Sequence, residues 1–336
     1  MKRITLAQGN GGRETNELIE KVFEKYLGNF ILGQGEDAGT FDVSGVQKYC
    51  VSTDSYVVNP IFFAGADIGK LSICGSSNDV AMMGAKPKYM SAGFILEEGF
   101  AICDLEKILQ SMAKELEYTQ IKLISADTKV VPKGNVDKIF INTTAIGEIQ
   151  KEGISAKNLK SGDIIILSSR IGSHGCVIFC SRSEIDLHSD LKSDCKQLYP
   201  MLEDIFKSKI PINALRDATR GGLAAVLNEW ANASGVEIII EEDKIPISKE
   251  VKGVCEILGL EPYSLANEGA CVLCVEACYA QEVCEILKKH PDGKEVAIIG
   301  SVEAENVKTP RVILQNSWGT KRYLDYPQGE LLPRIC

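Results

Sequence analysis

The sequence has no apolar run that approaches the length of a membrane-spanning helix. Its opening stretch, MKRITLAQGNGG, contains two basic side chains but no apolar segment of the kind that a signal peptide needs. Basic residues are in deficit, since 37 Lys and Arg face 46 Asp and Glu and give a net charge of −9. Phosphate binding along a nucleic acid requires clustered cations. We therefore expect neither a membrane nor a nucleic-acid partner.

The 12 cysteines occur without an export signal, so they are most simply reduced thiols in the cytoplasm. The composition is that of a globular protein, with 45% hydrophobic and 25% charged residues. A chain of 336 residues is long enough for two domains with separate cores. These properties predict a cytoplasmic protein of two domains.

Strands and long helices alternate in both halves of the chain. In the first half, apolar periodicity predicts helices at residues 14–26, 67–83 and 104–117, and strands at 49–58, 88–98, 121–125 and 138–147. In the second half it predicts helices at 174–181, 195–207, 220–233, 250–258 and 279–289, and strands at 163–168, 236–241, 270–276 and 296–302. This mixture is typical of α/β and α+β domains.

The polar segment 148–163, which contains two glycines, is the candidate linker between the domains. We accordingly predict an N-terminal domain at residues 1–150 and a C-terminal domain at 151–310. From residue 311 onward, one short strand is followed by glycines, prolines and polar residues, which predicts a mobile tail at 311–336. The last residue of that tail is Cys336.

Four short motifs in the first half place an aspartate in or beside an apolar segment. They are GEDAG, STDS, SNDV and SADTKVV, which contain Asp37, Asp54, Asp79 and Asp127. Burying a bare carboxylate is costly, so converging aspartates at such places suit one or two Mg²⁺ ions that bridge nucleotide phosphates. A cap of a helix or turn is the simpler account of any single one. The four together favour the metal site.

Glycine-rich stretches precede two of the predicted helices. In QGNGGRETNELIEKVF, backbone amides could approach a phosphate, and a plain flexible N-terminus is an equally good account. In LRDATRGGLAAVLNEWA, Asp217 and Arg220 either form a cap and turn or bind an anion or the tail at the start of the helix. Glu268 of the NEG motif precedes an apolar strand, where a carboxylate can face a cleft.

The terminal GELLPRIC leaves three readings of Cys336 open: a disulfide partner, an inert remnant, or a thiol on a flexible tether. It is not a prenylation motif, which needs the cysteine at the position of Pro333. The cysteines of CVLCVEACYAQEVC do not form a metal site by spacing. Cys271 and Cys274 would point to opposite faces of a strand.

Several of these motifs together resemble the HypE family of hydrogenase expression/formation proteins. They are GNGGRET, STDSYVVNPIFFAGADIGKLSICGSSNDVAMMGAKP, FILEEGF, ADTKVV, RDATRGGLAAVLNE, LANEG and the terminal PRIC. The family belongs to the aminoimidazole ribonucleotide synthetase superfamily, with the PurM-like fold. The resemblance implies an N-terminal α/β domain that forms a homodimer through its sheets, ATP near the dimer seam, and a C-terminal α+β domain.

The resemblance also implies a chemistry for the tail. The Cys336 thiol would accept a carbamoyl group from the carbamoyltransferase HypF. ATP would drive dehydration of the thiocarbamate to a thiocyanate. The cyanide would then pass to iron on the HypC–HypD complex during assembly of the NiFe hydrogenase site. The open alternatives are another ATP-dependent enzyme of the superfamily, or a non-catalytic scaffold that binds ATP and maturation partners.

The resemblance assigns roles to individual residues. Beside Cys336, Lys129 would neutralise charge on the transferred phosphoryl group, and Glu268 would position or deprotonate the thiocarbamate nitrogen. Nucleotide contacts are assigned to Asn10, Gly11, Gly12, Asp37, Asp54, Asp67, Asp79, Asp127 and Thr128. The Mg²⁺ ligands among them are Asp37, Asp54, Asp79 and Asp127.

Overall fold

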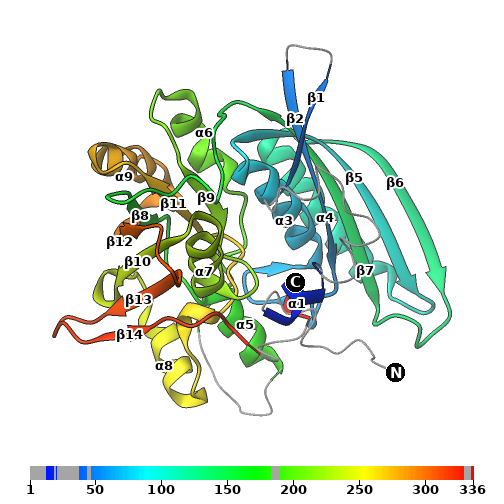
Figure 1. Cartoon of the computed structure of the whole chain (residues 1–336). Coiled ribbons are helices and arrows are strands. Elements are labelled where there is room, and N and C mark those ends of the chain that lie inside the picture. The colour runs from blue at the N-terminus through cyan, green and yellow to red at the C-terminus, as the bar shows by residue number, and fades with distance from the viewer. Residues whose placement is uncertain (1–12, 19, 21–37, 44–46, 183–189, 329–333) are drawn as a thin grey trace.

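The structure is a computed structural model that describes residues 13–18, 20, 38–43, 47–182, 190–328 and 334–336. Each half of the chain is built on its own β-sheet with helices packed against it (Figure 1). The fold is therefore the two-domain α/β and α+β arrangement that the sequence predicts. Within the described ranges, no helix has the length and apolar character needed to cross a membrane.

The N-terminal sheet has five strands in the order β1-β2-β7-β5-β6. Their bounds are β1 Gly39–Val43, β2 Gln47–Tyr56, β5 Ala85–Glu97, β6 Lys122–Val131 and β7 Ile139–Ile149. Neighbouring strands are antiparallel except β5 and β6, which run parallel. Strand β6 lies at the edge of this sheet, and nearly all of its side chains are exposed.

Helices α3 (Ile68–Met82) and α4 (Ile102–Thr119) pack on one another, and α3 packs against β2, β5 and β7 of this sheet. Helix α3 is buried on nearly all sides, because it also contacts β9 and α6 of the C-terminal domain. Its small residues permit this close packing. A Cβ atom on Gly75 would lie only 2.2 Å from the Tyr56 hydroxyl oxygen, which accepts a hydrogen bond from the Ser76 amide at 2.8 Å. Helix α3 is thereby held directly against β2.

Among the described residues of the N-terminal half there are three further short elements: α1 (Arg13–Leu18), β3 (Phe62–Phe63) and β4 (Ala66–Asp67). The helix predicted at 14–26 is represented by α1, and most of its remainder lies outside the described residues. The strand predicted at 121–125 is longer than expected, since β6 continues through the ADTKVV motif to Val131.

The C-terminal sheet has seven strands in the order β14-β13-β10-β12-β8-β11-β9. The bounds are β8 Ile164–Leu167, β9 Ala214–Asp217, β10 Val236–Glu241, β11 Cys271–Val275, β12 Ala297–Glu305, β13 Arg311–Gln315 and β14 Lys321–Tyr323. The helices are α5 Ser173–Arg182, α6 Tyr199–Lys207, α7 Gly222–Ser234, α8 Lys249–Leu258 and α9 Ala280–Lys288, with short 3₁₀ turns η4 Glu242–Lys244, η5 Pro262–Ser264, η6 Ala277–Tyr279 and η7 Pro291–Gly293.

This sheet is buried on both faces. Helix α7 packs on one face, and α6 and α9 share the core of the other. The alternation along β11 places Cys274 in the first core and Cys271 in the second. The expectation that these two cysteines point in opposite directions is confirmed.

The predicted tail begins too early. Residues 311–315 and 321–323 belong to the sheet, because β13 pairs in parallel with β10 and β14 pairs with β13. The short strand expected from residue 311 is present as β13, and its main chain is held by ladder hydrogen bonds, while β14 was not expected among the polar residues that follow. The linker predicted at 148–163 likewise begins inside β7. The mobility of the terminal residues stays a prediction.

Candidate active site

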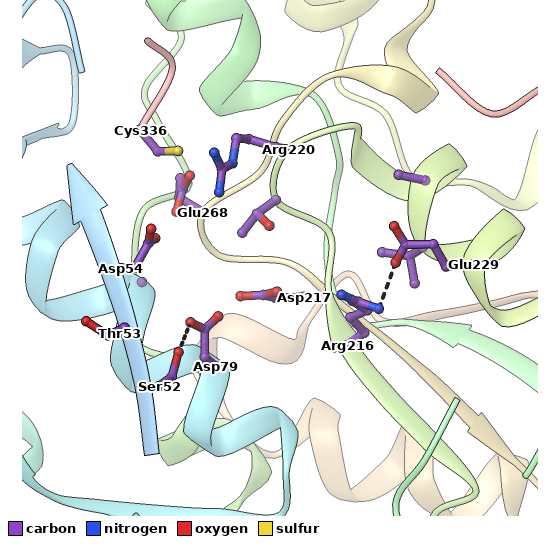
Figure 2. Close-up of a pocket in the computed structure, with 14 residues that line it drawn as sticks. Ser52, Thr53, Asp54, Asp79, Arg216, Asp217, Arg220, Glu229, Glu268 and Cys336 are labelled. Atoms are coloured by element: carbon purple, nitrogen blue, oxygen red, sulfur yellow. Dashed lines mark hydrogen bonds and ion pairs between the residues drawn. The ribbon is translucent and has the colours of Figure 1, made fainter. Parts of the chain in front are cut away.

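A pocket of about 300 Å³ lies between the two domains (Figure 2). The N-terminal domain contributes residues of β2 and α3, and the C-terminal domain contributes residues of β9, α7 and the loops beside them. The lining residues are Ser52, Thr53, Asp54, Gly75, Asp79, Arg216, Asp217, Thr219, Arg220, Ala225, Val226, Glu229, Glu268 and Cys336.

Strand β2 and helix α3 bring two aspartates to this pocket. Ser52 and Asp54 are two residues apart and therefore share one face of the strand. Gly75 and Asp79 are four residues apart and share one face of the helix. The Ser52 hydroxyl donates a hydrogen bond of 2.6 Å to Oδ2 of Asp79, which links the two elements. Figure 2 shows Asp54 and Asp79 on the same side of the pocket.

Two loops of the C-terminal domain supply Arg220 and Glu268. Arg220 lies just before α7, where Gly222 has a φ of +60° and a Cβ would lie 2.5 Å from the Leu265 carbonyl oxygen. Asn267 fastens the second loop, since its Oδ1 accepts from the Gly172 amide at 2.7 Å and its Nδ2 donates to a backbone carbonyl at 2.7 Å. The two loops thus hold the guanidinium and the carboxyl group in one place.

The pocket favours a neutral Glu268. Burial raises the pKa of Glu268 well above its ordinary value, negative charge at Cys195, Asp194 and Asp54 adds to this, and Arg220 partly opposes it. Oε1 of Glu268 is buried and has no hydrogen-bond partner among the described residues. Burial also raises the pKa of Asp54, again against the influence of Arg220. A buried acceptor without a partner is costly, so this atom is suited to a bound group.

The end of the chain is docked into the same pocket. The Cys336 carbonyl oxygen accepts a hydrogen bond from the Val57 amide at 2.9 Å, and the Ile335 carbonyl oxygen lies 2.8 Å from Nε2 of His174. Arg334 forms an ion pair with Asp137 at 2.7 Å. These contacts bury Ile335 and Cys336 in the core of the N-terminal domain.

The docked thiol is in its protonated form. Burial raises the pKa of Cys336 to about 12, Arg220 opposes the shift, and the carboxylates of Glu268 and Asp54 add to it. A thiolate at Cys336 and the guanidinium of Arg220 would stabilise each other, and Cys336 is the main cause of the raised pKa of Arg220. Figure 2 shows the sulfur atom directed toward Arg220, with Glu268 beside them.

Models of two known domains match this chain. The AIR synthase related protein N-terminal domain matches residues 35–149, and the C-terminal domain of the same family matches residues 160–313. Carbamoyl dehydratase HypE of Escherichia coli (strain K12) is 43% identical over 342 residues, with 100% of each chain covered.

This chain belongs to the HypE family of carbamoyl dehydratases.

Solved structures of HypE proteins agree with this assignment. The HypE of a HypE–HypF complex has a TM-score of 0.86 and 42% identity, covering 92% of this chain and 99% of that one. A hydrogenase maturation protein HypE in complex with ATP has a TM-score of 0.82 and 39% identity, covering 99% and 100%. A thiamine monophosphate kinase of Aquifex aeolicus, at 20% identity and a TM-score of 0.67, shares the fold alone.

The pocket of this HypE-family chain brings together six of the residues singled out from the sequence: Asp54, Asp79, Asp217, Arg220, Glu268 and Cys336. They come from β2, α3, β9, the loops before α7 and β11, and the chain end, so only the tertiary fold unites them. Whether each has its predicted role stays a prediction.

Three further predicted residues lie elsewhere, on the exposed edge strand β6: Asp127, Thr128 and Lys129. Lys129 and Asp127 form an ion pair with each other at 2.5 Å, and their side chains are 67% and 69% exposed. The pair lowers the pKa of Asp127. Asp127 was expected directly after a strand, and the structure places it within one. Neither side chain lines the pocket of this chain.

Asp67 caps helix α3. Its Oδ1 accepts hydrogen bonds from the amides of Gly69 at 2.7 Å and Lys70 at 3.0 Å and from the Ser111 hydroxyl at 2.5 Å. These three donors occupy one oxygen, which gives this carboxylate a structural task in addition to its predicted nucleotide contact. The remaining predicted residues, Asn10, Gly11, Gly12 and Asp37, lie outside the described residues.

Several polar residues of the pocket were not predicted from the sequence. Arg216 of β9 forms an ion pair of 2.7 Å with Glu229 of α7, which also accepts a hydrogen bond from the Tyr326 hydroxyl at 2.7 Å. Ser52, Thr53 and Thr219 complete this group. The RDATRGG motif could have indicated them, since it contains Arg216 and Thr219 as well as Arg220. Binding of the tail was one of the two interpretations of this motif.

Proposed function

We propose that this chain carries a carbamoyl group on the Cys336 thiol and dehydrates it with ATP to a protein thiocyanate, which supplies the cyanide ligand of a NiFe hydrogenase. The observation that supports this most strongly is the position of the last residue. Cys336 is buried in one pocket with Arg220, Glu268, Asp54 and Asp79. A terminal thiol placed among two aspartates, a neutral glutamic acid and an arginine is suited to chemistry on a group attached to sulfur.

The residues present fit this reaction. The oxygen of a thiocarbamate is a poor leaving group until it is phosphorylated, and loss of phosphate then requires removal of the protons on nitrogen. The partnerless Oε1 of Glu268 can accept a hydrogen bond from that nitrogen. Burial keeps Glu268 protonated in the free protein, and Arg220, which opposes this rise of the pKa, is placed to stabilise the ionised form that takes the proton. The burial of the pocket excludes water from the intermediate.

ATP and Mg²⁺ are the proposed cofactors. A HypE relative has been solved in complex with ATP. The described residues contain no cluster of three or more His, Cys, Asp or Glu side chains able to hold a metal ion. Mg²⁺ needs only one or two carboxylates when phosphates and water complete its shell, and Asp54 and Asp79 provide them. When bound, the ion neutralises phosphate charge.

A homodimer would allow Lys129 and Asp127 to take their predicted roles at the phosphoryl group and the Mg²⁺ ion. The apolar side chains of Leu123, Ile124 and Val130 on β6 are 42%, 59% and 66% exposed. A second copy that covers this strand would bury them and would bring the Lys129–Asp127 pair into the dimer seam. We place the triphosphate near that seam, where Lys129 would neutralise the transferred phosphoryl group.

The proposed partners follow from the chemistry of the Cys336 thiol. HypF would donate the carbamoyl group, as one HypE relative forms a HypE–HypF complex, and a HypC–HypD complex would receive the cyanide on iron. The cysteines are present as thiols, which suits a cytoplasmic location. A scaffold without catalysis, or another enzyme of the superfamily, would have no use for a terminal thiol inside the pocket.

The half-reactions can be separated with Asp79→Asn. Carbamoyl acceptance needs only the thiol and the donor, so the variant should still gain the mass of one carbamoyl group. Dehydration should slow by about a hundred- to a thousandfold, as for the loss of one electrostatic stabiliser. Asp104→Asn, at a half-buried residue that pairs with Lys107 on α4, is the matched control. Loss of water from Asp79→Asn at the unaltered rate would remove Asp79 from the phosphate site.

A further inference from the structure

Helix α5 presents two different faces to its surroundings. His174, Ile178 and Arg182 are spaced four residues apart and form one face, which lies against the docked chain end and the N-terminal core. Cys176 and Cys180 are also four apart, and they lie on the opposite face, since two residues correspond to about 200° of rotation. This second face packs against α8.

The first face holds the backbone of the tail at two points. Nε2 of His174 donates to the Ile335 carbonyl oxygen at 2.8 Å. The guanidinium of Arg182 donates to the carbonyl oxygens of Arg334 and Asn59. Residues at the two ends of helix α5 therefore hold the backbone of Arg334 and Ile335, and a shift of this helix changes how firmly the tail is docked.

The second face carries a pair of thiols. The side chains of Cys176 on α5 and Cys255 on α8 are hydrogen-bonded to each other. Both are buried, in an apolar cluster with Val251, Val254 and Leu265. Cys255 also lines a surface pocket of about 400 Å³ next to α8.

The hydrogen bond distinguishes the two sulfurs. Because the Cys176 thiol donates, it lowers the pKa of Cys255, while the same contact and burial raise the pKa of Cys176. A thiolate is the nucleophile in thiol–disulfide exchange. The Cys255 sulfur is therefore the one prepared to attack, and its neighbour is placed to resolve the mixed disulfide.

We propose that Cys176 and Cys255 are a dithiol site for low-molecular-weight disulfides, and that their oxidation releases the Cys336 tail. The Cys255 thiolate attacks the small disulfide and expels one thiolate, which leaves a mixed disulfide on Cys255. Cys176 then attacks the Cys255 sulfur, and its proton leaves with the second small thiol. Two protein thiols are oxidised and one small disulfide is reduced to two thiols.

The coupling to the tail is mechanical. A disulfide holds its sulfurs about 2.05 Å apart, closer than any hydrogen-bonded pair of thiols. Oxidation therefore draws α5 toward α8, and the face with His174 and Arg182 moves away from the carbonyl groups that it holds. The reduced protein keeps Cys336 in the active-site pocket. The oxidised protein exposes it.

The full chain with Cys103→Ser, Cys278→Ser and Cys336→Ala tests the site, because these changes remove the exposed thiols and the acceptor thiol. It is equilibrated with glutathione disulfide and glutathione, the remaining thiols are blocked with N-ethylmaleimide, and peptides are mapped by mass spectrometry. We expect a Cys176–Cys255 cross-link that dithiothreitol reverses. We also expect carboxypeptidase to remove the last residues about tenfold faster after oxidation, the factor that a lost net hydrogen bond gives.

Variants of the same background make the result decisive. Cys176→Ala and Cys255→Ala should each abolish the cross-link and the change in digestion, and Cys180→Ala, on the same helix face, should retain both. Folding of each variant is checked by thermal denaturation. Glutathione that stays on Cys255 without a cross-link, or a cross-link through Cys180, would overturn the dithiol site. A cross-link that leaves the digestion rate unchanged would overturn its coupling to the tail.

Discussion

The backbone carbonyl oxygen of Ile335 accepts a hydrogen bond of 2.8 Å from Nε2 of the buried His174. A carbonyl can only accept, so Nε2 carries the proton. Nδ1 lies 2.8 Å from the Ser193 hydroxyl, and burial lowers the pKa of His174, which favours the neutral ring. An imidazole in a fixed tautomer thus joins the end of the chain to the start of α5.

Removal of this donor should release the tail. His174→Ala leaves the Ile335 carbonyl oxygen buried without a partner, which costs about 1–3 kcal/mol and should increase the undocked population about five- to a hundredfold. The rate at which a maleimide alkylates Cys336 should rise accordingly. His174→Gln, whose amide can donate from nearly the same position, should restore part of the protection.

His290→Ala is the matched control for this experiment. His290 caps η7, where its Nδ1 accepts a hydrogen bond from the Asp292 amide at 3.2 Å. This contact does not involve the tail. The variant should leave the alkylation rate unchanged. Equal rates in His174→Ala and the unaltered protein would show that other contacts hold the tail.

The raised pKa of Glu268 predicts a pH-dependent cost to stability. In the unfolded chain this carboxyl ionises near its ordinary value of 4.5, while in the folded protein it stays protonated to a higher pH. Folding therefore binds a proton, and the contribution of Glu268 to the free energy of unfolding falls as the pH rises above about 4.5. Glu268→Gln removes this loss, because glutamine does not ionise.

We expect urea titrations to show that Glu268→Gln is more stable than the unaltered protein at pH 7 and that the difference shrinks toward pH 4. Dehydration of the thiocarbamate should be lost in the same variant. Glu256→Gln on the exposed face of α8 should change neither quantity. A stability difference that stays constant from pH 4 to pH 7 would mean that Glu268 is already ionised in the folded protein.

The exposed apolar residues of β6 predict a dimer that one charge can disrupt. Ile124→Asp would bury an unpaired carboxylate in the seam, so sedimentation equilibrium should show a shift from dimer toward monomer. Ile257→Asp, at an equally exposed position on α8, should not change the mass. A monomeric unaltered protein at micromolar concentration would contradict the proposed seam.

Regular periodicity made most of the fold predictable from the sequence. Strand β2 contains β-branched and aromatic residues, and the long apolar pattern of α3 predicts a helix whatever it packs against, so the elements that carry Asp54 and Asp79 were predictable from local sequence. Strands β1, β9 and β14 were not predicted. They have three to five residues each, too few for a period to show, and they form because neighbouring strands are already in place.

The assembly of the pocket was less predictable, because it depends on contacts between distant segments. A carboxylate in a motif can cap a helix or face a ligand, and Asp67 shows the first in the structure. The ADTKVV motif reads as a turn after a strand, yet pairing with β5 extends β6 through it. The chain end reads as a loose tail, yet His174 and Val57 hold its backbone.

The central claim is tested most directly by the intact mass and the modified residue of this protein after incubation with HypF and its carbamoyl donor, and then with ATP and Mg²⁺. We predict the gain of one carbamoyl group in the first step and the loss of one water in the second, with both changes mapped to Cys336. Cys336→Ala should fold and show neither change. A carbamoyl group on any other cysteine, or a modified Cys336 that keeps its water in the presence of ATP and Mg²⁺, would contradict the account.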